Sequence, residues 1–431
     1  MIKVAKHIIN WFRLKRYRKE NTFIKFQPKF LHKHQSLFKL FSLFGKVAFF
    51  YLEKKYNLKV RISINNIYWA VGHVYPEYDW LCRLNNYNMK NGYALMYIYA
   101  YPSCSLTRFF KENFKHPRVK VLTSNFLYIC LYSYAIRNPN KVVDVSTNSL
   151  CSQSREGVIS HRNVFRYKQF EYASILRAQE KEKYPLLENY FGSHDLPSFI
   201  KNKEKFALIQ IKTQIVNATL QITSPNTYLK TINFLRNQGY QVIFVGREKM
   251  PKIFEDYGVY NYAESNFANA ENDYLLNRYS KFTLSSASGF SYMADTMGTP
   301  LLSINSWYII GYPGRKTTNI PSRIKYRGEL LGPIAQVELF YKIGQVLPWR
   351  EKELLKNITP INVDDDEIFA VTKLIITNKN YFLENMSEYE IRFQQLFPND
   401  IPSIELSRYS YTYLNEVAKL FPEDFDKKYL K

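Results

Sequence analysis

Cysteine and histidine are scarce in this chain, and their placement excludes two classes of site. The four cysteines form no C-x-x-C pair and have no histidine pair beside them. A zinc site is therefore not predicted, and a reduced, cytosolic setting fits the sequence. The last histidine is His194, so Ser288 cannot be the nucleophile of an ordinary α/β-hydrolase, whose triad histidine follows the serine.

Long apolar runs are also missing. The longest uncharged apolar stretch, residues 125–136, is shorter than the ~20 residues that a membrane span requires. Five cations between Arg13 and Lys19 interrupt the one candidate secretory signal. Neither a transmembrane helix nor secretion is predicted.

Acidic residues are few, above all near the start of the chain. The whole chain has 60 Lys and Arg against 37 Asp and Glu, and residues 1–60 hold fifteen of these cations and two acids. Cations mixed with bulky apolar side chains, such as Trp11, Phe12, Phe38 and Phe41, are typical of a helix on anionic lipid, where each cation adds about 1 kcal/mol. The alternatives are a basic, partly ordered leader, or aromatic side chains that pack on the main body. Nucleic acid is not a predicted partner, because no zinc-finger or RNP signature accompanies the charge.

The length of 431 residues and the 46% hydrophobic content predict a folded protein with two domains. From Phe206 to Asn305, short apolar strands alternate with helical patterns. Strands are expected at residues 206–211, 242–245, 281–284 and 301–304, and helices near residues 225–238, 273–279 and 290–297. This alternation predicts a parallel, doubly wound sheet that binds ligands at the carboxyl ends of its strands.

The run Ser285-Ser286-Ala287-Ser288-Gly289 falls between a strand and a helix. Free backbone N–H groups and the helix dipole favour an anion there, such as a nucleotide diphosphate. Small side chains let the phosphate approach, and the hydroxyls of Ser286, Ser288 and Ser291 add donors. The alternative is a tight turn in which the serines only cap the helix.

The segment "SSASGFSYMADTMGTPLLSIN" resembles the donor-site segment of GT-B glycosyltransferases. More closely, the chain resembles a poorly characterised family of bacterial glycosyltransferases found among surface-polysaccharide genes. The likeness covers most of residues 65–425 and includes "VGHVYPEYDWLCRL", "NTYLKTINFLRNQGYQVIFVG", "IPSRIKYRGELLGPIAQVELF" and "SRYSYTYLNEVAKLFPE". It implies an α/β fold of two Rossmann-like doubly wound domains, with a basic amphipathic extension before them.

The resemblance and the strand ends together predict the donor site. Its expected residues are Lys212, Gly246, Arg247, Ser286, Ser288, Gly289, Phe290, Ser291 and Asn305. The family's pattern suggests His-x-Arg where this chain has Gln210-Ile211-Lys212. Lys212 keeps a cation for phosphate, whereas Gln210 cannot act as an acid or a base. Lys212 could also be a solvated strand end.

The acceptor side is expected in the N-terminal half, at a helix opened by Gly72 and His73. Gly72 permits close backbone approach, and His73, Glu77 or Asp79 could accept the proton of the attacking hydroxyl. The alternative is that His73 caps the helix and the two acids are surface groups.

Neither a metal nor another cofactor is predicted. Asp364 and Asp366 look like a metal-binding D-x-D, but they precede a periodic apolar run, where carboxylates cap a helix. Helix N–H groups and cations would then stabilise the leaving group. Arg315 and Lys316 follow the strand ending at Asn305 and could close over the donor.

The expected organisation is a basic leader (1–60), an acceptor-side α/β domain (61–204), a donor domain (205–380) and C-terminal helices packing back across both (381–431). The predicted protein is a cytoplasmic glycosyltransferase, peripheral on the inner face of the membrane through residues 1–44. It would move a sugar from a nucleotide sugar to a lipid-linked or oligosaccharide acceptor in surface-polysaccharide synthesis, such as lipopolysaccharide or capsule. The alternatives are a nucleotide-sugar epimerase on the same fold and a non-catalytic, membrane-associated sugar-binding or scaffold protein, which Gln210 would suit.

Overall fold

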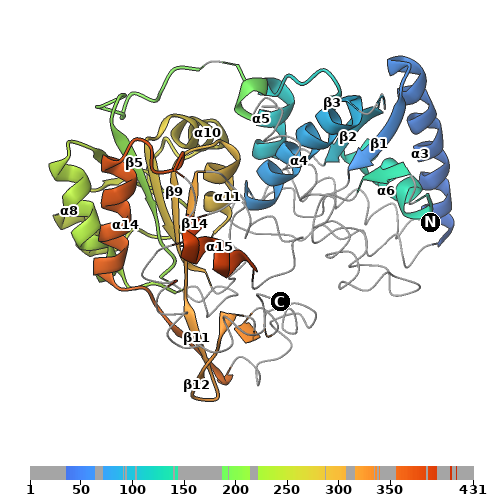
Figure 1. Cartoon of the computed structure of the whole chain (residues 1–431). Coiled ribbons are helices and arrows are strands. Elements are labelled where there is room, and N and C mark those ends of the chain that lie inside the picture. The colour runs from blue at the N-terminus through green and yellow to red at the C-terminus, as the bar shows by residue number, and fades with distance from the viewer. Residues whose placement is uncertain are drawn as a thin grey trace.

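The computed structural model of the chain is shown in Figure 1. All structural statements below concern the residues that it describes. These are residues 35–63, 71–90, 92, 95–101, 104–138, 141–143, 187–192, 194–213, 222–286, 288–306, 316–333, 335–336, 339, 356–384, 387–395, 408–409 and 414.

The N-terminal unit is built on a four-stranded parallel sheet in the order β3-β2-β1-β4. Its strands are β1 (Lys59–Ser63), β2 (Leu95–Tyr101), β3 (Val119–Thr123) and β4 (Val142–Val143). The connecting helices are α4 (Val71–Lys90), α5 (Ser105–Asn113) and α6 (Asn125–Arg137). Right-handed crossovers place α4 and α5 on one face of this sheet and α6 on the other.

A further helix, α3 (Gln35–Tyr56), precedes β1 and packs along α6. Gly45 makes this packing possible, because a Cβ atom there would collide with the backbone carbonyl of Cys130. Phe38, Phe41 and Phe49 of α3 are buried in the core of the N-terminal unit. The assignment of residues 35–60 to a separate leader is therefore wrong, since their aromatic side chains pack on the main body. Residues 1–34 lie outside the described residues.

The C-terminal unit contains a seven-stranded parallel sheet in the order β14-β10-β9-β8-β5-β6-β7. Its strands are β5 (Phe206–Gln210), β6 (Gln241–Phe244), β7 (Tyr260–Asn261), β8 (Phe282–Ser286), β9 (Leu301–Ser306), β10 (Thr317–Pro321) and β14 (Arg408–Tyr409). From β5, the strands β6 and β7 follow in chain order towards one edge of the sheet. From β8, which lies on the other side of β5, the strands β9 and β10 follow towards the opposite edge. Both units are thus doubly wound α/β units, as expected, and the strand order of the second reverses between β5 and β8.

The helices of the C-terminal unit are η5 (Pro225–Tyr228), α8 (Leu229–Asn237), α9 (Lys252–Asp256), α10 (Ala270–Tyr279), α11 (Gly289–Thr296), α14 (Asp365–Thr377) and α15 (Glu388–Gln395). The pair η5 and α8, together with α10 and α11, lie close to the three helices predicted before residue 305, whereas α9 was not predicted. Gly239, with φ of +81°, ends α8, and the side chain of Asn269 caps α10. Ser224 makes no side-chain cap, and the first turn after it is the 3₁₀ helix η5.

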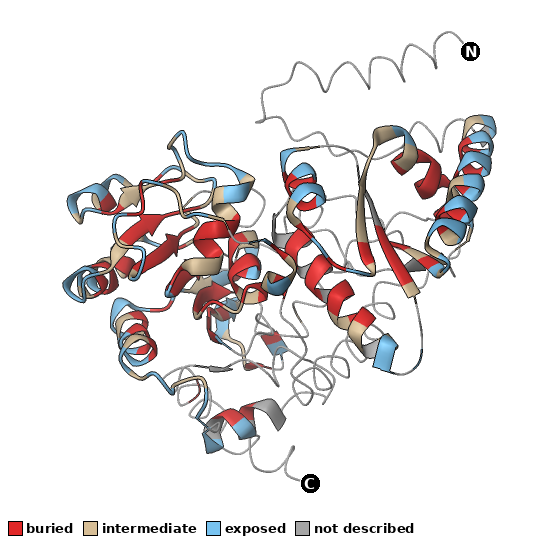
Figure 2. Cartoon of the chain, turned by 90° about the horizontal axis from the view of Figure 1, so that it is seen from above, coloured by how far each residue is buried: buried red, intermediate tan, exposed pale blue. Residues whose placement is uncertain are grey.

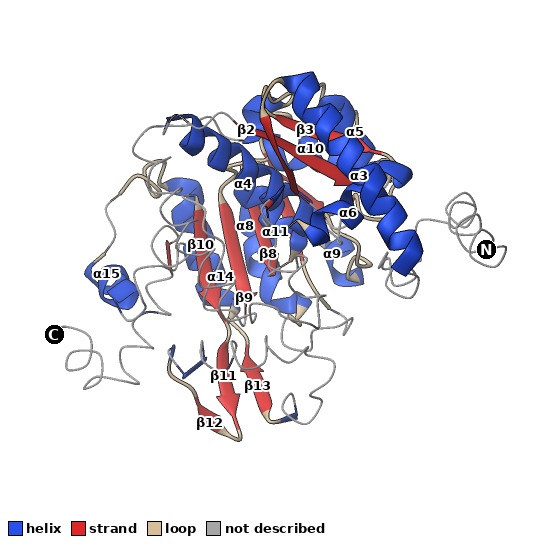
Figure 3. Cartoon of the chain, turned by 90° about the vertical axis from the view of Figure 1, so that its right-hand side faces the viewer, coloured by secondary structure: helices blue, strands red, loops and turns tan. Residues whose placement is uncertain are grey.

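A small antiparallel sheet, which the sequence did not predict, continues beyond the carboxyl end of β10 (Figure 3). It pairs β11 (Arg323–Tyr326) with β12 (Glu329–Leu330) on one side and β13 (Ile358–Ile361) on the other. In the C-terminal segment, Phe393 and Leu414 belong to a core cluster of the C-terminal unit. Most of residues 396–431 lie outside the described residues, so packing of this segment across both units remains an expectation.

One hydrophobic cluster extends across the two units. Helix α4 packs against α11, and Met293 of α11 and Met297, which follows it, belong to the same buried cluster as Tyr75 and Tyr78 of α4. The long buried stretch of α4 is visible near the centre of Figure 2.

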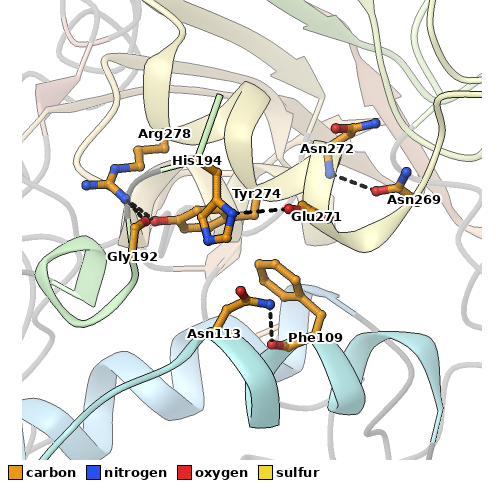
Figure 4. A network of polar contacts seen from close by, with 9 residues as sticks. All are labelled: Phe109, Asn113, Gly192, His194, Asn269, Glu271, Asn272, Tyr274 and Arg278. Atoms are coloured by element: carbon orange, nitrogen blue, oxygen red, sulfur yellow. Dashed lines mark hydrogen bonds and ion pairs between the residues drawn. The ribbon is translucent and has the colours of Figure 1, made fainter. Parts of the chain in front are cut away.

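Polar contacts tie the segment between the two units to α10 (Figure 4). The Arg278 guanidinium donates to the carbonyl oxygen of Gly192 at 3.0 Å, and His194 Nδ1 lies 3.2 Å from a Glu271 carboxylate oxygen. Phe109 of α5 lies below these contacts in the figure, and its ring centroid is 5.5 Å from that of Tyr274 on α10. Helix α10 is therefore held to both the connecting segment and the N-terminal unit.

Candidate functional site

The residues predicted for the donor site gather at one edge of the C-terminal sheet. Lys212 follows β5, and Gly246 and Arg247 follow β6. The serine run begins with the last two residues of β8, and Asn305 lies in β9. These four strands are neighbours in the order β9-β8-β5-β6 and all run parallel, so their carboxyl ends lie side by side. In doubly wound sheets, ligands bind in the crevice where the strand order reverses, which here is between β5 and β8.

A chain of buried hydrogen bonds crosses this switch point. The Ser291 hydroxyl donates to Ser285 Oγ at 2.7 Å, and the Ser285 hydroxyl donates to Gln210 Oε1 at 2.7 Å. The Gln210 amide in turn donates to the carbonyl oxygen of Ile211 at 3.1 Å. The small hydroxyl side chains thus link α11, β8 and β5, and Gln210 is the residue at which these bonds meet.

The start of α11 is capped by its own serines. Ser288 Oγ accepts hydrogen bonds from the N–H groups of Phe290 at 3.1 Å and Ser291 at 3.4 Å, while the Ser288 N–H donates to Ser291 Oγ. The expectation that these N–H groups are free to cradle a diphosphate is therefore wrong for this conformation, because the capping box already satisfies them. Among the described residues of this turn, Gly289 has a backbone N–H that donates to no acceptor. The Phe290 ring is buried in the core.

Asn305 also has a structural task that differs from its predicted role. It lies at φ of +53°, where the pairing of β9 with β10 shifts register. Its side-chain amide donates to Thr223 Oγ1 at 3.1 Å, and its side-chain oxygen accepts the Val363 N–H at 2.8 Å. Asn305 is fully buried and joins three segments at the carboxyl edge instead of facing a donor.

Lys212 supplies a half-buried cation beside the serine run. Its backbone N–H donates to Ser286 Oγ at 2.9 Å. Burial lowers the pKa of the Lys212 ammonium from its ordinary value, and the nearby carboxylate of Glu248 acts in the opposite direction. Glu248, which the sequence analysis overlooked, accepts the Thr213 N–H at 2.6 Å and so connects the ends of β5 and β6.

The turn after β6 combines a glycine with a cation. Gly246 has φ of +110°, and a Cβ atom built there would lie 3.1 Å from Gln210 Cγ. The backbone conformation therefore favours glycine, and any side chain there would also push Gln210 aside by a few tenths of an ångström. The next residue, Arg247, is exposed at this edge.

A carboxyl group near Arg247 has an unusual environment. Asp273 on α10 accepts a hydrogen bond from the Tyr262 hydroxyl at 2.9 Å. Burial raises the pKa of Asp273 to about 6, although the Tyr262 hydrogen bond and the charge of Arg247 both favour the ionised form. Sequence reasoning missed Asp273 because its environment depends on residues from β6, the segment after β7 and α10 together.

The predicted acceptor-side residues lie on α4, whose first turn contains Gly72 and His73. The side chains of His73 and Glu77 are outside the described residues. Asp79 is buried, and its carboxylate pairs with Arg83 Nε at 2.7 Å within α4. Burial raises the pKa of Asp79 and Arg83 lowers it. Asp79 therefore forms an ion pair inside the fold. It is neither a surface acid nor a free carboxylate that could accept the proton of an acceptor hydroxyl, so both interpretations of Asp79 from the sequence are wrong.

The remaining charged candidates have simpler roles. Asp364 caps α14 by accepting the Glu367 N–H at 2.7 Å, which confirms the capping interpretation, and Asp366 pairs with Lys230. Lys316 is exposed at the start of β10, beside the first residue of β9, so it lies at the opposite edge from the candidate site. Arg315 lies outside the described residues.

No group of three or more His, Cys, Asp or Glu side chains in the described ranges could hold a metal ion. Among the helices of those same ranges, none is long and apolar enough to cross a membrane.

No model of a known protein family matches the chain, and no curated protein matches it either. Solved structures with some likeness include the iron-containing dodecameric glycosyltransferase TibC from enterotoxigenic E. coli H10407, at 14% identity and a TM-score of 0.33 over 57% of this chain. That match spans 59% of the length of TibC. The E. coli ADP-heptose LPS heptosyltransferase II matches at 11% identity and a TM-score of 0.34, over 68% of this chain and 100% of that one. A glycosyl transferase family 9 protein from Veillonella parvula DSM 2008 matches at 8% identity and a TM-score of 0.40, over 74% and 97%.

Proposed function

We propose that this chain is a glycosyltransferase that moves a sugar from a nucleoside-diphosphate sugar to an acceptor hydroxyl. The observation that carries the proposal is the cation Lys212 beside the β5/β8 switch point, with the cation Arg247 at the end of the neighbouring strand β6. The carboxyl edge of a doubly wound sheet is the usual place for a nucleotide, and two cations there suit a diphosphate.

In this proposal, Lys212 and Arg247 hold the diphosphate and stabilise the charge that develops on the leaving group, without a metal or another cofactor. Gly246 lets the donor approach the end of β6, and the Gly289 N–H adds a hydrogen bond. Glu248 follows β6, the second strand of this sheet in chain order. Doubly wound nucleotide-binding units place the acid that binds ribose hydroxyls after this strand.

The acceptor would approach α4, where His73 or Glu77 takes the proton of its hydroxyl. We propose a lipid-linked or oligosaccharide acceptor in bacterial surface-polysaccharide synthesis, at the cytoplasmic face of the membrane. This part of the proposal rests on the sequence resemblance and on the basic start of the chain.

Titration calorimetry with ADP and UDP tests the donor site. Loss of one charged hydrogen bond costs about 1.5–3 kcal/mol, so Lys212→Ala should weaken nucleotide binding by roughly 10–100-fold. Lys249→Ala is the matched control, because Lys249 is an exposed lysine after the neighbouring strand β6 and should not affect binding. Absence of binding by the wild type across a panel of nucleotides would overturn the proposal and favour the scaffold alternative.

Product analysis by mass spectrometry then separates transfer from epimerisation. A glycosyltransferase incubated with a donor panel and membrane extract should release nucleoside diphosphate and lengthen an acceptor. An epimerase should convert the nucleotide sugar without any acceptor, and that result would replace glycosyl transfer by the epimerase alternative.

A further inference from the structure

Helix α3 has apolar side chains on two opposite sides. One side carries Phe38, Phe41, Phe49 and Leu52, which are buried against the body of the N-terminal unit. The other side carries large apolar residues that are between 46% and 63% exposed: Leu40, Leu43, Phe44, Val47, Phe50 and Tyr51. Their spacing of three, four and seven residues places them on one continuous stripe, which we call the outer face of α3.

The outer face is extended by a neighbouring helix. Phe126 of α6 is 51% exposed, and its ring centroid lies 6.2 Å from that of Phe44. Single exposed apolar residues are common on proteins, whereas a contiguous apolar stripe marks a site of interaction.

The exposed charges that α3 itself carries are all positive. The exposed charged side chains of α3 are Lys39, Lys46, Lys54 and Lys55. The single acid of this helix, Glu53, is half-buried, accepts the Val60 N–H at 3.2 Å and lies 3.6 Å from Lys141 Nζ. An apolar stripe bordered by lysines, with no exposed acid on the helix, matches the chemistry of an anionic lipid surface.

The position of α3 leaves the candidate site free. α3 packs on α6, on the face of the N-terminal sheet opposite α4, which contacts the C-terminal unit. Figure 1 accordingly shows α3 at the outer side of the molecule, far from α11 and the C-terminal sheet. A flat surface could therefore contact α3 without covering the carboxyl edge of that sheet.

We propose that the outer face of α3 binds the surface of an anionic lipid bilayer. The apolar side chains enter the boundary between headgroups and acyl chains, and the lysines lie at the level of the lipid phosphates. This inference differs from attachment through residues 1–44, because Val47, Phe50, Tyr51, Lys54 and Lys55 belong to the docking surface. It also means that deleting residues 1–44 would remove part of the core together with part of this surface.

Sedimentation of the full-length chain with vesicles tests the proposal. The wild type should bind phosphatidylglycerol-containing vesicles more strongly than pure phosphatidylcholine vesicles, and added salt should weaken the binding. Val47→Glu combined with Phe50→Glu should lower binding to the anionic vesicles by about tenfold or more. The matched control is Leu374→Glu combined with Leu383→Glu, which places two acids at exposed apolar positions of the C-terminal unit and should leave vesicle binding unchanged.

Failure of this proposal can be told apart from failure of the proposed function, because nucleotide binding is measured without vesicles. Nucleotide affinity should be the same in the wild type and in both double variants. Wild-type vesicle binding by the Val47→Glu/Phe50→Glu variant would overturn the proposal and assign attachment to another part of the chain. A second result would also overturn the proposal and would favour self-association instead. In that result the wild type does not bind vesicles but forms a dimer, and the Val47→Glu/Phe50→Glu variant is a monomer. Melting curves of both variants establish that they remain folded.

Discussion

Replacing Gly246 by alanine tests the candidate site through backbone geometry. Gly246 lies at φ of +110° in the turn after β6, where a side chain is strained. The added methyl group would lie 3.1 Å from Gln210 Cγ and would have to displace it by a few tenths of an ångström. Gln210 accepts the Ser285 hydroxyl at 2.7 Å, so its displacement also disturbs the hydrogen bonds at the switch point.

Gly239 provides the matched control. It has φ of +81° at the end of α8, just before the first residue of β6 and so at the other end of that strand. An added methyl group there meets its nearest atom, Lys205 Nζ, at an ordinary 3.9 Å. A left-handed conformation costs a non-glycine residue about 1–2 kcal/mol, which Gly239→Ala should lose in free energy of unfolding. Gly246→Ala should lose about 2–3 kcal/mol, because disturbing one buried hydrogen bond adds about 1 kcal/mol.

Urea denaturation and titration calorimetry with ADP and UDP separate strain from function. Both variants should unfold at lower urea concentration than the wild type. Gly246→Ala should also weaken nucleotide binding by about tenfold or more, equivalent to about 1.4 kcal/mol, while Gly239→Ala should bind as the wild type does. Unchanged affinity in Gly246→Ala, with the expected loss of stability, would refute the placement of the nucleotide at the end of β6.

Four further substitutions probe the carboxyl and imidazole groups. The folded-state pKa of Asp273, about 6, exceeds its ordinary value of 3.8, so the stability contributed by the protonated form is complete below the lower value and is lost as pH rises through the higher one. Asp273→Asn should therefore gain stability relative to the wild type as pH rises from about 4 to about 6, and parallel urea-denaturation profiles over that range would contradict this account. Asp79→Asn should lower the free energy of unfolding by about 3 kcal/mol, because it leaves Arg83 without its buried partner, and wild-type stability with lost turnover would instead restore Asp79 as the base. His73→Ala should lower turnover by roughly 10²–10⁴-fold with unchanged nucleotide affinity, whereas near-normal turnover together with an inactive Glu77→Gln would move the base to Glu77.

The sequence predicts most of the elements between residues 206 and 305 because the signals for them are local. The apolar run at 206–211, the glycine after α8 and the serine before α11 each act within a few residues of the element that they define. Even the function of Asp364 as a cap follows from the apolar periodicity directly after it. Alternation of these elements then implies the parallel sheet and the edge at which its ligand would bind.

The roles of individual site residues are less predictable, since they depend on partners far away in the sequence. Asn305 follows a strand at the expected edge, yet its side chain is committed to Thr223 and Val363. Ser288 and Ser291 form a capping box that accepts the N–H groups at the first turn of α11. Composition alone does not decide whether such serines cap the helix or bind phosphate.

The basic start of the chain illustrates a related difficulty. Its aromatic residues were expected to face lipid, but those at Phe38, Phe41 and Phe49 face the protein, and Phe44 and Phe50 face outward. Both sides of α3 carry large apolar residues, so helical periodicity alone does not tell which side packs on the protein. The structure is needed to show which side is buried.

The packing between the two units bears on how substrates reach the candidate site. Tyr274 of α10 stacks on Phe191 at 4.6 Å and lies 5.5 Å from Phe109 of the N-terminal unit. Together with Met293 and Met297, these side chains form part of one continuous buried cluster across both units. Aromatic pairs add about 0.5–1.5 kcal/mol each beyond their burial, and a large apolar interface opposes the relative motion that separate domains otherwise show. Rotating the units apart would expose this cluster, so we expect the two units to move as one body during donor entry and product release.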